Sequence, residues 1–112
     1  MSERHDLVKS NIDSLLLCLV NRQPMYGYQI IKELKDQSQG YFNFKEGTLY
    51  PALHRLEKSG LIEGKWDSLL SGQQRKYYHI TDKGYANLAE KKSNWFEFLT
   101  AMNMIIQSGE TR

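Results

Sequence analysis

Apolar residues recur three or four positions apart in successive blocks along the first half of the chain, a spacing that predicts amphipathic helices. The first block runs from Leu7 to Asn21 and the second from Tyr26 to Gln37, with Pro24 between them. Ser38-Gln39-Gly40 ends the second block, because such clusters interrupt helices. The apolar positions of the two blocks are Val8, Ile12, Leu15, Leu16, Leu19, Val20, Tyr26, Ile30, Ile31 and Leu34.

A third block, from about Gly47 to Ser59, predicts a short helix that Gly60 ends. Pro51 would break the middle of a helix, since it has no backbone N–H. It is tolerated in a first turn, where the N–H groups have no partner within the helix, so we expect Pro51 there. One side of this helix is expected to be buried, and its residues are Leu49, Ala52, Leu53 and Leu56.

The second half of the chain predicts two strands followed by one long helix. The strands are Leu61 to Asp67 and Lys76 to Ile80, and the residues between them include Ser71 and Gly72, which favour a turn. Thr81 is expected to cap the last helix through its side-chain oxygen, and that helix should run from Asp82 to about Gln107.

The order helix–helix–helix–hairpin predicts a mainly α fold with a β-hairpin, namely a winged helix-turn-helix with a long C-terminal dimerisation helix. In that fold the third helix enters the major groove of DNA and the hairpin, or wing, contacts the backbone or minor groove. We expect residues 1–80 to form the DNA-binding domain and residues 81–112 to form the dimerisation helix.

Composition narrows the function classes. The chain has 112 residues and a net charge of +2, and residues 44–80 hold six Lys/Arg against four Asp/Glu, so they carry all of the excess. Its longest apolar run, Leu15 to Val20, is too short to span a membrane. The single Cys18 cannot form a disulfide within the chain, which fits a reducing environment, and we expect it to be a small buried hydrophobic residue. Because the sequence shows no export signal, we expect a cytoplasmic protein.

Enzymatic chemistry finds little support in the residues. There is no phosphate-binding loop, because Glu46-Gly47-Thr48 lacks the lysine and the spacing of a P-loop. The three histidines are scattered and offer no ligand pair one helical turn apart. We therefore expect no catalytic residues, no metal and no cofactor.

The third helix and the hairpin carry the side chains that fit a DNA duplex. Thr48 and Tyr50 lie near the start of the helix, where base edges and the closest phosphates are reached. Arg55 and Lys58 are expected to neutralise phosphates, and Lys45 precedes a helix N-terminus, which favours an anion. The DNA-binding candidates are Tyr28, Lys45, Thr48, Tyr50, His54, Arg55, Lys58, Arg75, Lys76 and Tyr77.

Strand alternation sends Arg75 and Tyr77 to one face of the hairpin and Lys76 and Tyr78 to the other. Since one face of the hairpin must pack on the core, only one of Arg75 and Lys76 is expected to face DNA directly. A twisted hairpin would nevertheless let both contribute.

The last helix has a heptad pattern, which predicts pairing of two chains into a two-fold homodimer with an inverted-repeat DNA site. More apolar residues, among them Phe96, Phe98, Met104 and Ile105, lie off this seam, and one small domain has no second face on which to bury them. The seam is Tyr85, Leu88, Lys92, Trp95, Leu99, Met102 and Ile106.

Five segments resemble, in matching order, the PadR family of transcriptional regulators. They are Tyr26 to Ile30, Gly47 to Leu53, Leu56 to Ile62, Arg75 to Tyr78 and Ile80 to Gly84. The resemblance covers residues 8–90 and the chain is similar to the short subgroup with a single C-terminal helix. It implies a dimeric repressor of an inverted-repeat operator, and many members release DNA on meeting a small molecule.

In some short members a Trp at the place of Trp95 recognises aromatic drugs, so the resemblance implies a planar aromatic effector here. Its expected site is Trp95, Phe98, Leu99 and Met102. Another class of function stays open, namely a winged-helix protein-interaction module that does not bind specific DNA. It would keep the same core but would not need Tyr50, Arg55, Arg75 and Lys76 together.

Overall fold

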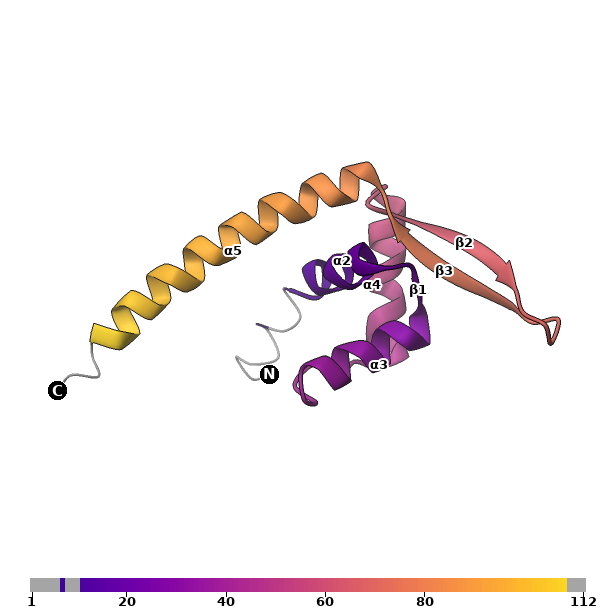
Figure 1. The fold of residues 1–112 in the computed structure, drawn as a ribbon, viewed down its shortest axis with the longest axis horizontal. Coiled ribbons are helices and arrows are strands. Elements are labelled where there is room, and N and C mark those ends of the chain that lie inside the picture. The colour runs from indigo at the N-terminus through magenta and orange to yellow at the C-terminus, as the bar shows by residue number, and fades with distance from the viewer. Residues whose placement is uncertain (1–6, 8–10, 109–112) are drawn as a thin grey trace.

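A computed structural model describes residue 7 and residues 11–108 of the chain, and it divides into a compact body, a projecting hairpin and a long helix (Figure 1). Three helices form the body: α2 (Ile12–Arg22), α3 (Gly27–Gln37) and α4 (Glu46–Lys58). The hairpin consists of β2 (Ile62–Ser68) and β3 (Gln74–Ile80), and α5 (Asp82–Ser108) follows. This is the predicted winged helix-turn-helix arrangement. The expected position of Val8 in the first helix lies outside the described residues.

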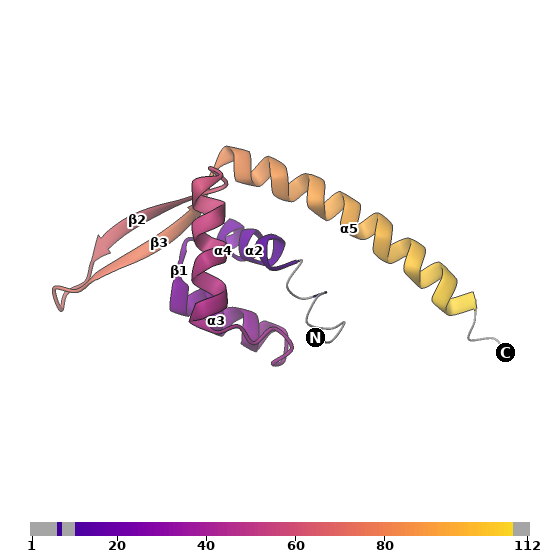
Figure 2. The same cartoon turned by 180° about the vertical axis from the view of Figure 1, so that it is seen from behind.

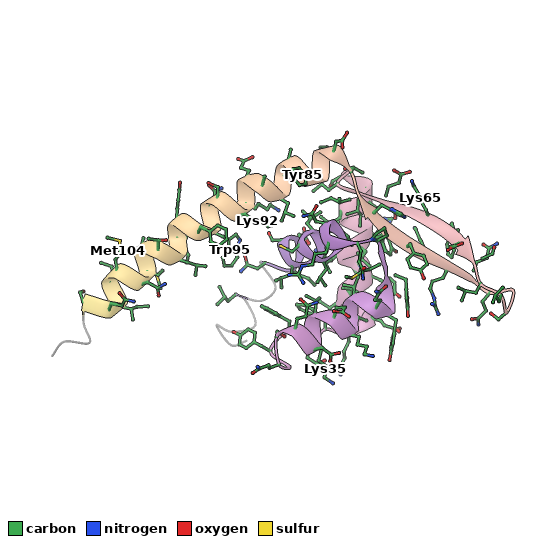
Figure 3. All side chains as sticks on the ribbon, in the orientation of Figure 1. Lys35, Lys65, Tyr85, Lys92, Trp95 and Met104 are labelled. Atoms are coloured by element: carbon green, nitrogen blue, oxygen red, sulfur yellow. The ribbon has the colours of Figure 1, made fainter. Side chains whose placement is uncertain are left out.

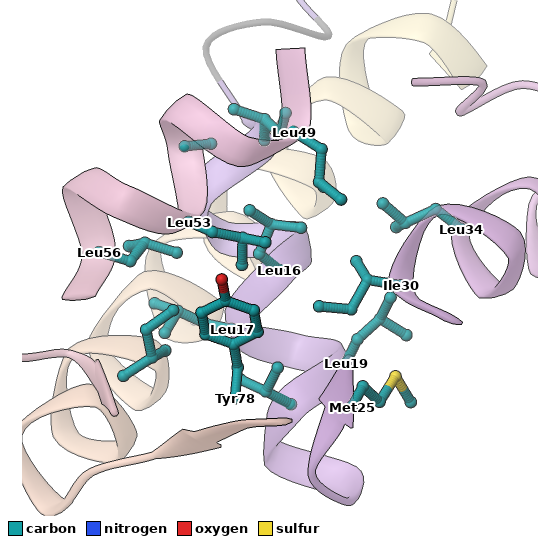
Figure 4. Close-up of a cluster of buried hydrophobic side chains, with 14 of the residues drawn as sticks. Leu16, Leu17, Leu19, Met25, Ile30, Leu34, Leu49, Leu53, Leu56 and Tyr78 are labelled. Carbon is teal, nitrogen blue, oxygen red and sulfur yellow. The ribbon is translucent and has the colours of Figure 1, made fainter. Parts of the chain in front are cut away.

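Apolar side chains from every helix meet in one core beneath the sheet (Figure 4). Leu16 and Leu17 of α2, Ile30 of α3 and Leu49 of α4 are fully buried at its centre. All four residues of the predicted α4 stripe are buried, and so are Ile12, Leu19 and Val20 of the first block. The periodicity therefore identified most of the core positions of these three helices, but it missed Leu17. Leu15 and Ile31 are only partly buried against this core.

The start of α4 differs from the prediction for Pro51. The helix begins at Glu46, so Pro51 lies inside it, in the second turn rather than the first. Proline donates no hydrogen bond to the carbonyl four residues earlier, which is that of Gly47. The helix nevertheless continues to Lys58, because the buried stripe on its other side anchors it to the core.

A short strand that the sequence did not predict completes the sheet. β1 (Met25–Tyr26) pairs antiparallel with β3, which gives the strand order β1-β3-β2. Met25 lies opposite Tyr78 and Tyr26 lies opposite Tyr77. As a result α3 begins at Gly27 instead of Tyr26, and the chain enters α3 directly from the sheet. The pairing of β1 with β3 therefore connects the wing to the N-terminal end of α3.

The base of α5 is fixed to the end of α4. Thr81 Oγ1 accepts a hydrogen bond from the Gly84 backbone N–H at 3.0 Å, as the capping prediction requires, and donates one to the Gly60 carbonyl at 2.6 Å. Gly84 packs against Leu61, whose carbonyl carbon would lie 2.9 Å from a Cβ at this position. These contacts set the direction in which α5 leaves the body.

Beyond its first turns, α5 extends away from the body on the side opposite the wing (Figure 2). Gly84 and Leu88 are its only buried residues within the described chain. Several large apolar side chains further along are exposed, including Phe96 (66%) and Ile105 (75%). None of the helices in the described part of the chain combines the length and the apolar character needed to span a bilayer.

Candidate nucleic-acid interface

The side of α4 that faces away from the core carries the predicted polar and aromatic set. Because Leu49, Leu53 and their neighbours occupy the buried side, the remaining positions of the helix are turned outward. Lys45 precedes the first turn as the N-cap residue and is also exposed, close to backbone N–H groups that attract an anion. The predicted contact residues of the helix are all exposed, namely Thr48, Tyr50, His54, Arg55 and Lys58, and so are Glu46, Gly47 and Pro51.

Tyr50 packs on the start of α3 while 42% of its surface stays exposed. Its ring occupies the space above Gly27, where a Cβ would lie 2.6 Å from Tyr50 Cζ. The absence of a side chain at Gly27 therefore lets the ring pack closely against the start of α3. The next residue of α3, Tyr28, is 62% exposed.

Arg55 points toward α2 and forms an ion pair with Asp13, with Arg55 Nη2 3.1 Å from Asp13 Oδ1. Both side chains remain partly open to solvent, at 58% and 35% exposure. An ion pair this exposed contributes little to stability, on the order of 0–1 kcal/mol. It does hold the guanidinium at the α2 edge of the helix and offsets its charge.

The two faces of the wing follow the predicted alternation, with Arg75 and Tyr77 on one side. The Arg75 guanidinium lies over the Tyr26 ring, 4.0 Å from its centroid. Tyr77 meets the same ring edge-on, with centroids 5.5 Å apart. Arg75 is thus held by stacking on β1, and Asp67 lies opposite it in the strand register, although neither ion pair among the described residues includes Arg75.

Lys76 and Tyr78 lie on the opposite face, next to the core. Lys76 Nζ is 3.1 Å from Glu57 Oε1 of α4, and it lies 5.4 Å from the centroid of the Tyr78 ring. Burial raises the pKa of the Tyr78 phenol. The ammonium of Lys76 therefore has a carboxylate partner at ion-pair distance within the protein.

Sequence reasoning did not single out Glu57 or Trp66. Glu57 sits in the last turn of α4 and looked like an ordinary surface acid, because its strand partner lies 19 residues further along. Trp66 is 65% exposed on β2, although a tryptophan in a strand usually suggests core. No pattern within the sequence pairs Glu57 with Lys76, since the contact depends on the angle between α4 and the wing.

A second feature is a large apolar groove between α5 and the body, with a volume of about 820 Å³. Its walls come from α5, from α2, and from Leu7, Tyr41 and Phe42. Trp95 is half-buried on the side of α5 that faces α2, while Met104 lies outside the groove (Figure 3). The α5 seam residues in the walls are Leu88, Lys92, Trp95, Leu99, Met102 and Ile106.

The groove brings together all four predicted effector residues, Phe98 included, but not Tyr85 of the predicted seam. Cys18 also borders it and is half-buried, so the expectation of a buried hydrophobe holds only in part. Within the described residues, no group of three His, Cys, Asp or Glu side chains is placed to hold a metal ion.

Residues 16–90 match the family model described as the transcriptional regulator PadR-like family. An uncharacterized protein of Lysinibacillus sphaericus is 35% identical over 107 residues, which cover 96% of this chain and 98% of that protein. A PadR-like transcriptional regulator from Bacillus cereus has a similar crystal structure, with a TM-score of 0.81 and 35% identity over 91% of this chain and 97% of that one. A transcriptional regulator of Mycobacterium tuberculosis is 35% identical over 68 residues, or 61% of this chain and 60% of that protein.

Proposed function

The chain belongs to the PadR-like family of transcriptional regulators, and from this premise we propose that it is a homodimeric repressor that binds an inverted-repeat operator. The observation that carries the proposal is the outward side of α4, where polar, aromatic and basic side chains lie beside a projecting wing. In this proposal residues 1–80 bind DNA and residues 81–112 join the two chains.

The first turns of α4 read the operator. Thr48 and Tyr50 are exposed near the helix N-terminus, where a recognition helix reaches base edges in the major groove. His54 and Lys58 follow on the same outward side and contact the phosphate backbone. These later contacts hold the helix in register and make binding dependent on salt.

Residues around α4 extend the contact to the flanking backbone. Lys45 meets a phosphate at the N-terminus of α4, and Tyr28 donates its hydroxyl to another beside α3. On the wing, Arg75 and Tyr77 approach the minor groove or its phosphates, because Arg75 is held by stacking on Tyr26 and by neither ion pair of the described residues. Arg55 adds a phosphate contact when its pair with Asp13 opens.

The exposed apolar surface of α5 supports the homodimer. Leu99, Met102 and Ile106 are between 44% and 51% exposed in a single chain, and the 820 Å³ groove beside them has few polar atoms. A second copy of α5 would cover this surface and bury its apolar side chains. Two-fold symmetry then places the two recognition helices about 34–36 Å apart, or a multiple of it, and the operator repeats in inverted orientation.

The same groove is the proposed site for a planar aromatic effector. Trp95 offers a flat ring, and Phe98, Leu99 and Met102 form an adaptable apolar wall next to it. A ligand wedged there would change the angle between α5 and the body and so the separation of the two α4 helices. Repression would be relieved because both half-sites could no longer be reached together.

Selection from a random duplex library with the purified protein, at two salt concentrations, tests the DNA-binding proposal. We expect an inverted repeat to be recovered by the natural protein and lost with Tyr50→Ala and Arg75→Ala. Asp36→Ala, at an exposed position near the end of α3 and outside the proposed contacts, serves as the control. Failure to enrich any sequence, even at low salt, would reject operator binding and favour a protein-interaction module.

Effector binding is tested by tryptophan emission in a Trp66→Phe variant. The chain has two tryptophans, so Trp95 alone remains in this variant. Titration with planar aromatics, beginning with 2-naphthoate, should quench Trp95 and weaken operator binding in parallel. Unchanged emission and unchanged DNA affinity across the panel would contradict this part of the proposal.

A further inference from the structure

Glu57, in the last turn of α4, contacts both strands of the wing with one carboxylate. Its Oε1 lies 3.1 Å from Lys76 Nζ on β3, and its Oε2 accepts a hydrogen bond from the Gly64 backbone N–H on β2 at 3.3 Å. The side chains of Glu57 and Lys76 are 31% and 29% exposed, so solvent reaches the pair only in part. One residue of the recognition helix thus holds the two strands at once.

The surroundings of Lys76 compensate its charge from several directions. Besides the Glu57 carboxylate, the ammonium lies 5.4 Å from the Tyr78 ring centroid and 5.9 Å from that of Trp66. Aromatic faces attract cations at such distances. A phosphate that recruited Lys76 would have to break all three interactions.

Gly64 leaves the space that this arrangement needs. A Cβ at Gly64 would lie 2.9 Å from Glu57 Oε2 and would also overlap the side chain of Lys76. In the strand register Gly64 faces Tyr78, and Trp66 faces Lys76, so all four residues share one side of the wing. Any larger residue at Gly64 would push the carboxylate and the ammonium away from the sheet.

We propose that Glu57, Gly64 and Lys76 form a wing latch that sets the angle between α4 and the wing, and that Lys76 is a positioning residue rather than a phosphate contact. This inference rests on the proposed function, because the angle matters for fitting two adjacent grooves of one duplex. It assigns the phosphate contact of the wing to Arg75, on the opposite face.

A latch at this point has a mechanical reason. β2 and β3 project from the body, and their buried residues, Ile62 and Tyr78, lie toward the base of the hairpin. Glu57 reaches Gly64, which lies opposite Tyr78, and also Lys76, which lies two residues further out along β3. If the wing already has its DNA-bound direction in the free protein, less conformational entropy is lost when DNA binds.

The latch is tested first in the free protein, by NMR measurement of amide hydrogen exchange at Gly64. Exchange should become at least several-fold faster in Glu57→Ala and Lys76→Met, while Lys76→Arg, which retains the cation, should remain close to the natural protein. Equal Gly64 exchange in all four proteins would overturn the latch. This arm uses no DNA, so it stands whether or not an operator is found.

The role of Lys76 is tested by the salt dependence of binding to the selected operator. Each phosphate contact contributes about 0.9 to the slope of log K against log salt. The double variant Glu57→Gln/Lys76→Met leaves the net charge unchanged, and we expect several-fold weaker binding with an unaltered slope. Lys58→Met is the comparison and should make the slope shallower by about 0.9.

An equally shallow slope in the double variant would overturn the assignment and return Lys76 to the phosphate contacts. If the natural protein binds no duplex at all, the proposed function fails and the part of this inference that concerns DNA fails with it. The exchange measurement then decides the latch alone.

Discussion

Gly27 and Tyr50 fit against each other across the junction of α3 and α4, so that a Cβ on Gly27 would overlap the tyrosine ring, 2.6 Å from Cζ and 2.8 Å from Cε1. The first residue of α3 therefore decides where the ring on the recognition helix lies. Since Tyr50 is also a proposed DNA contact, the packing of this pair also affects DNA recognition.

Gly27→Ala should affect DNA binding more than stability. The displaced ring is 42% exposed and can swing toward solvent, so we expect the free energy of unfolding to fall by less than about 1 kcal/mol. Operator affinity should fall by about tenfold, or about 1.4 kcal/mol, because the hydroxyl is moved. Chemical denaturation and a binding titration measure the two effects.

A double-mutant cycle with Tyr50→Ala identifies the cause of that loss. Once the ring is absent, Gly27→Ala should weaken operator binding no further. Additive losses in the double variant would mean that Gly27 acts independently of Tyr50, for instance through its own backbone.

Gly84→Ala should destabilise the protein although it places a better helix former in α5. A Cβ there would overlap the backbone of Leu61, which cannot move aside as a flexible side chain can. We expect a loss of about 1–3 kcal/mol in the free energy of unfolding. Gly47→Ala is the matched control, because no atom lies within 4 Å of the new Cβ, and it should stabilise α4 by about 0.5–1 kcal/mol.

Asp13→Asn should strengthen operator binding by releasing Arg55. Stability should change by less than about 1 kcal/mol, since the ion pair is exposed. Binding at low salt should tighten several-fold, because Arg55 no longer has to leave Asp13 before it contacts a phosphate. Asp36→Asn removes the same charge from the exposed end of α3 and serves as the control. Equal operator affinities for the two variants would show that Arg55 makes no such contact.

Leu99→Glu should separate the proposed dimer into single chains. Leu99 is 44% exposed in one chain and would be buried by the second copy, where an unpaired carboxylate is costly. Sedimentation equilibrium should give about twice the 13.1 kDa of one chain for the natural protein and one chain for the variant. Leu70→Glu, at the fully exposed wing tip, should stay dimeric. A monomeric natural protein would reject the dimer.

Much of the fold could be predicted because periodicity reports burial. The stripe of α4 and the Thr81 cap follow from spacing and side-chain chemistry, and the structure confirms both. β1 could not be predicted, since two residues carry no pattern and their strand character comes from pairing with β3. Pro51 was placed one turn too early, because tertiary burial extends α4 through a residue that local rules put at its start.

The candidate site was predicted as a set of exposed side chains but not as a set of contacts. Exposure of Thr48, Tyr50 and Lys58 follows from the helix pattern. The partners of Arg55 and Lys76 do not, because Asp13 and Glu57 are distant in sequence and reach them only after the helices and the wing have packed. These contacts show which of the predicted cations form an ion pair within the chain.

The most direct test of the account compares two duplexes in one binding titration: the selected inverted repeat, and the same repeat with about five base pairs inserted between its half-sites. One helical turn of DNA is about 10–10.5 base pairs, so the insertion moves the half-sites to opposite sides of the duplex. A rigid dimer joined through α5 should bind the lengthened site far more weakly, close to the affinity of a single half-site. Equal affinity for both duplexes would contradict the account, because the two recognition helices would then not be held in a fixed relation.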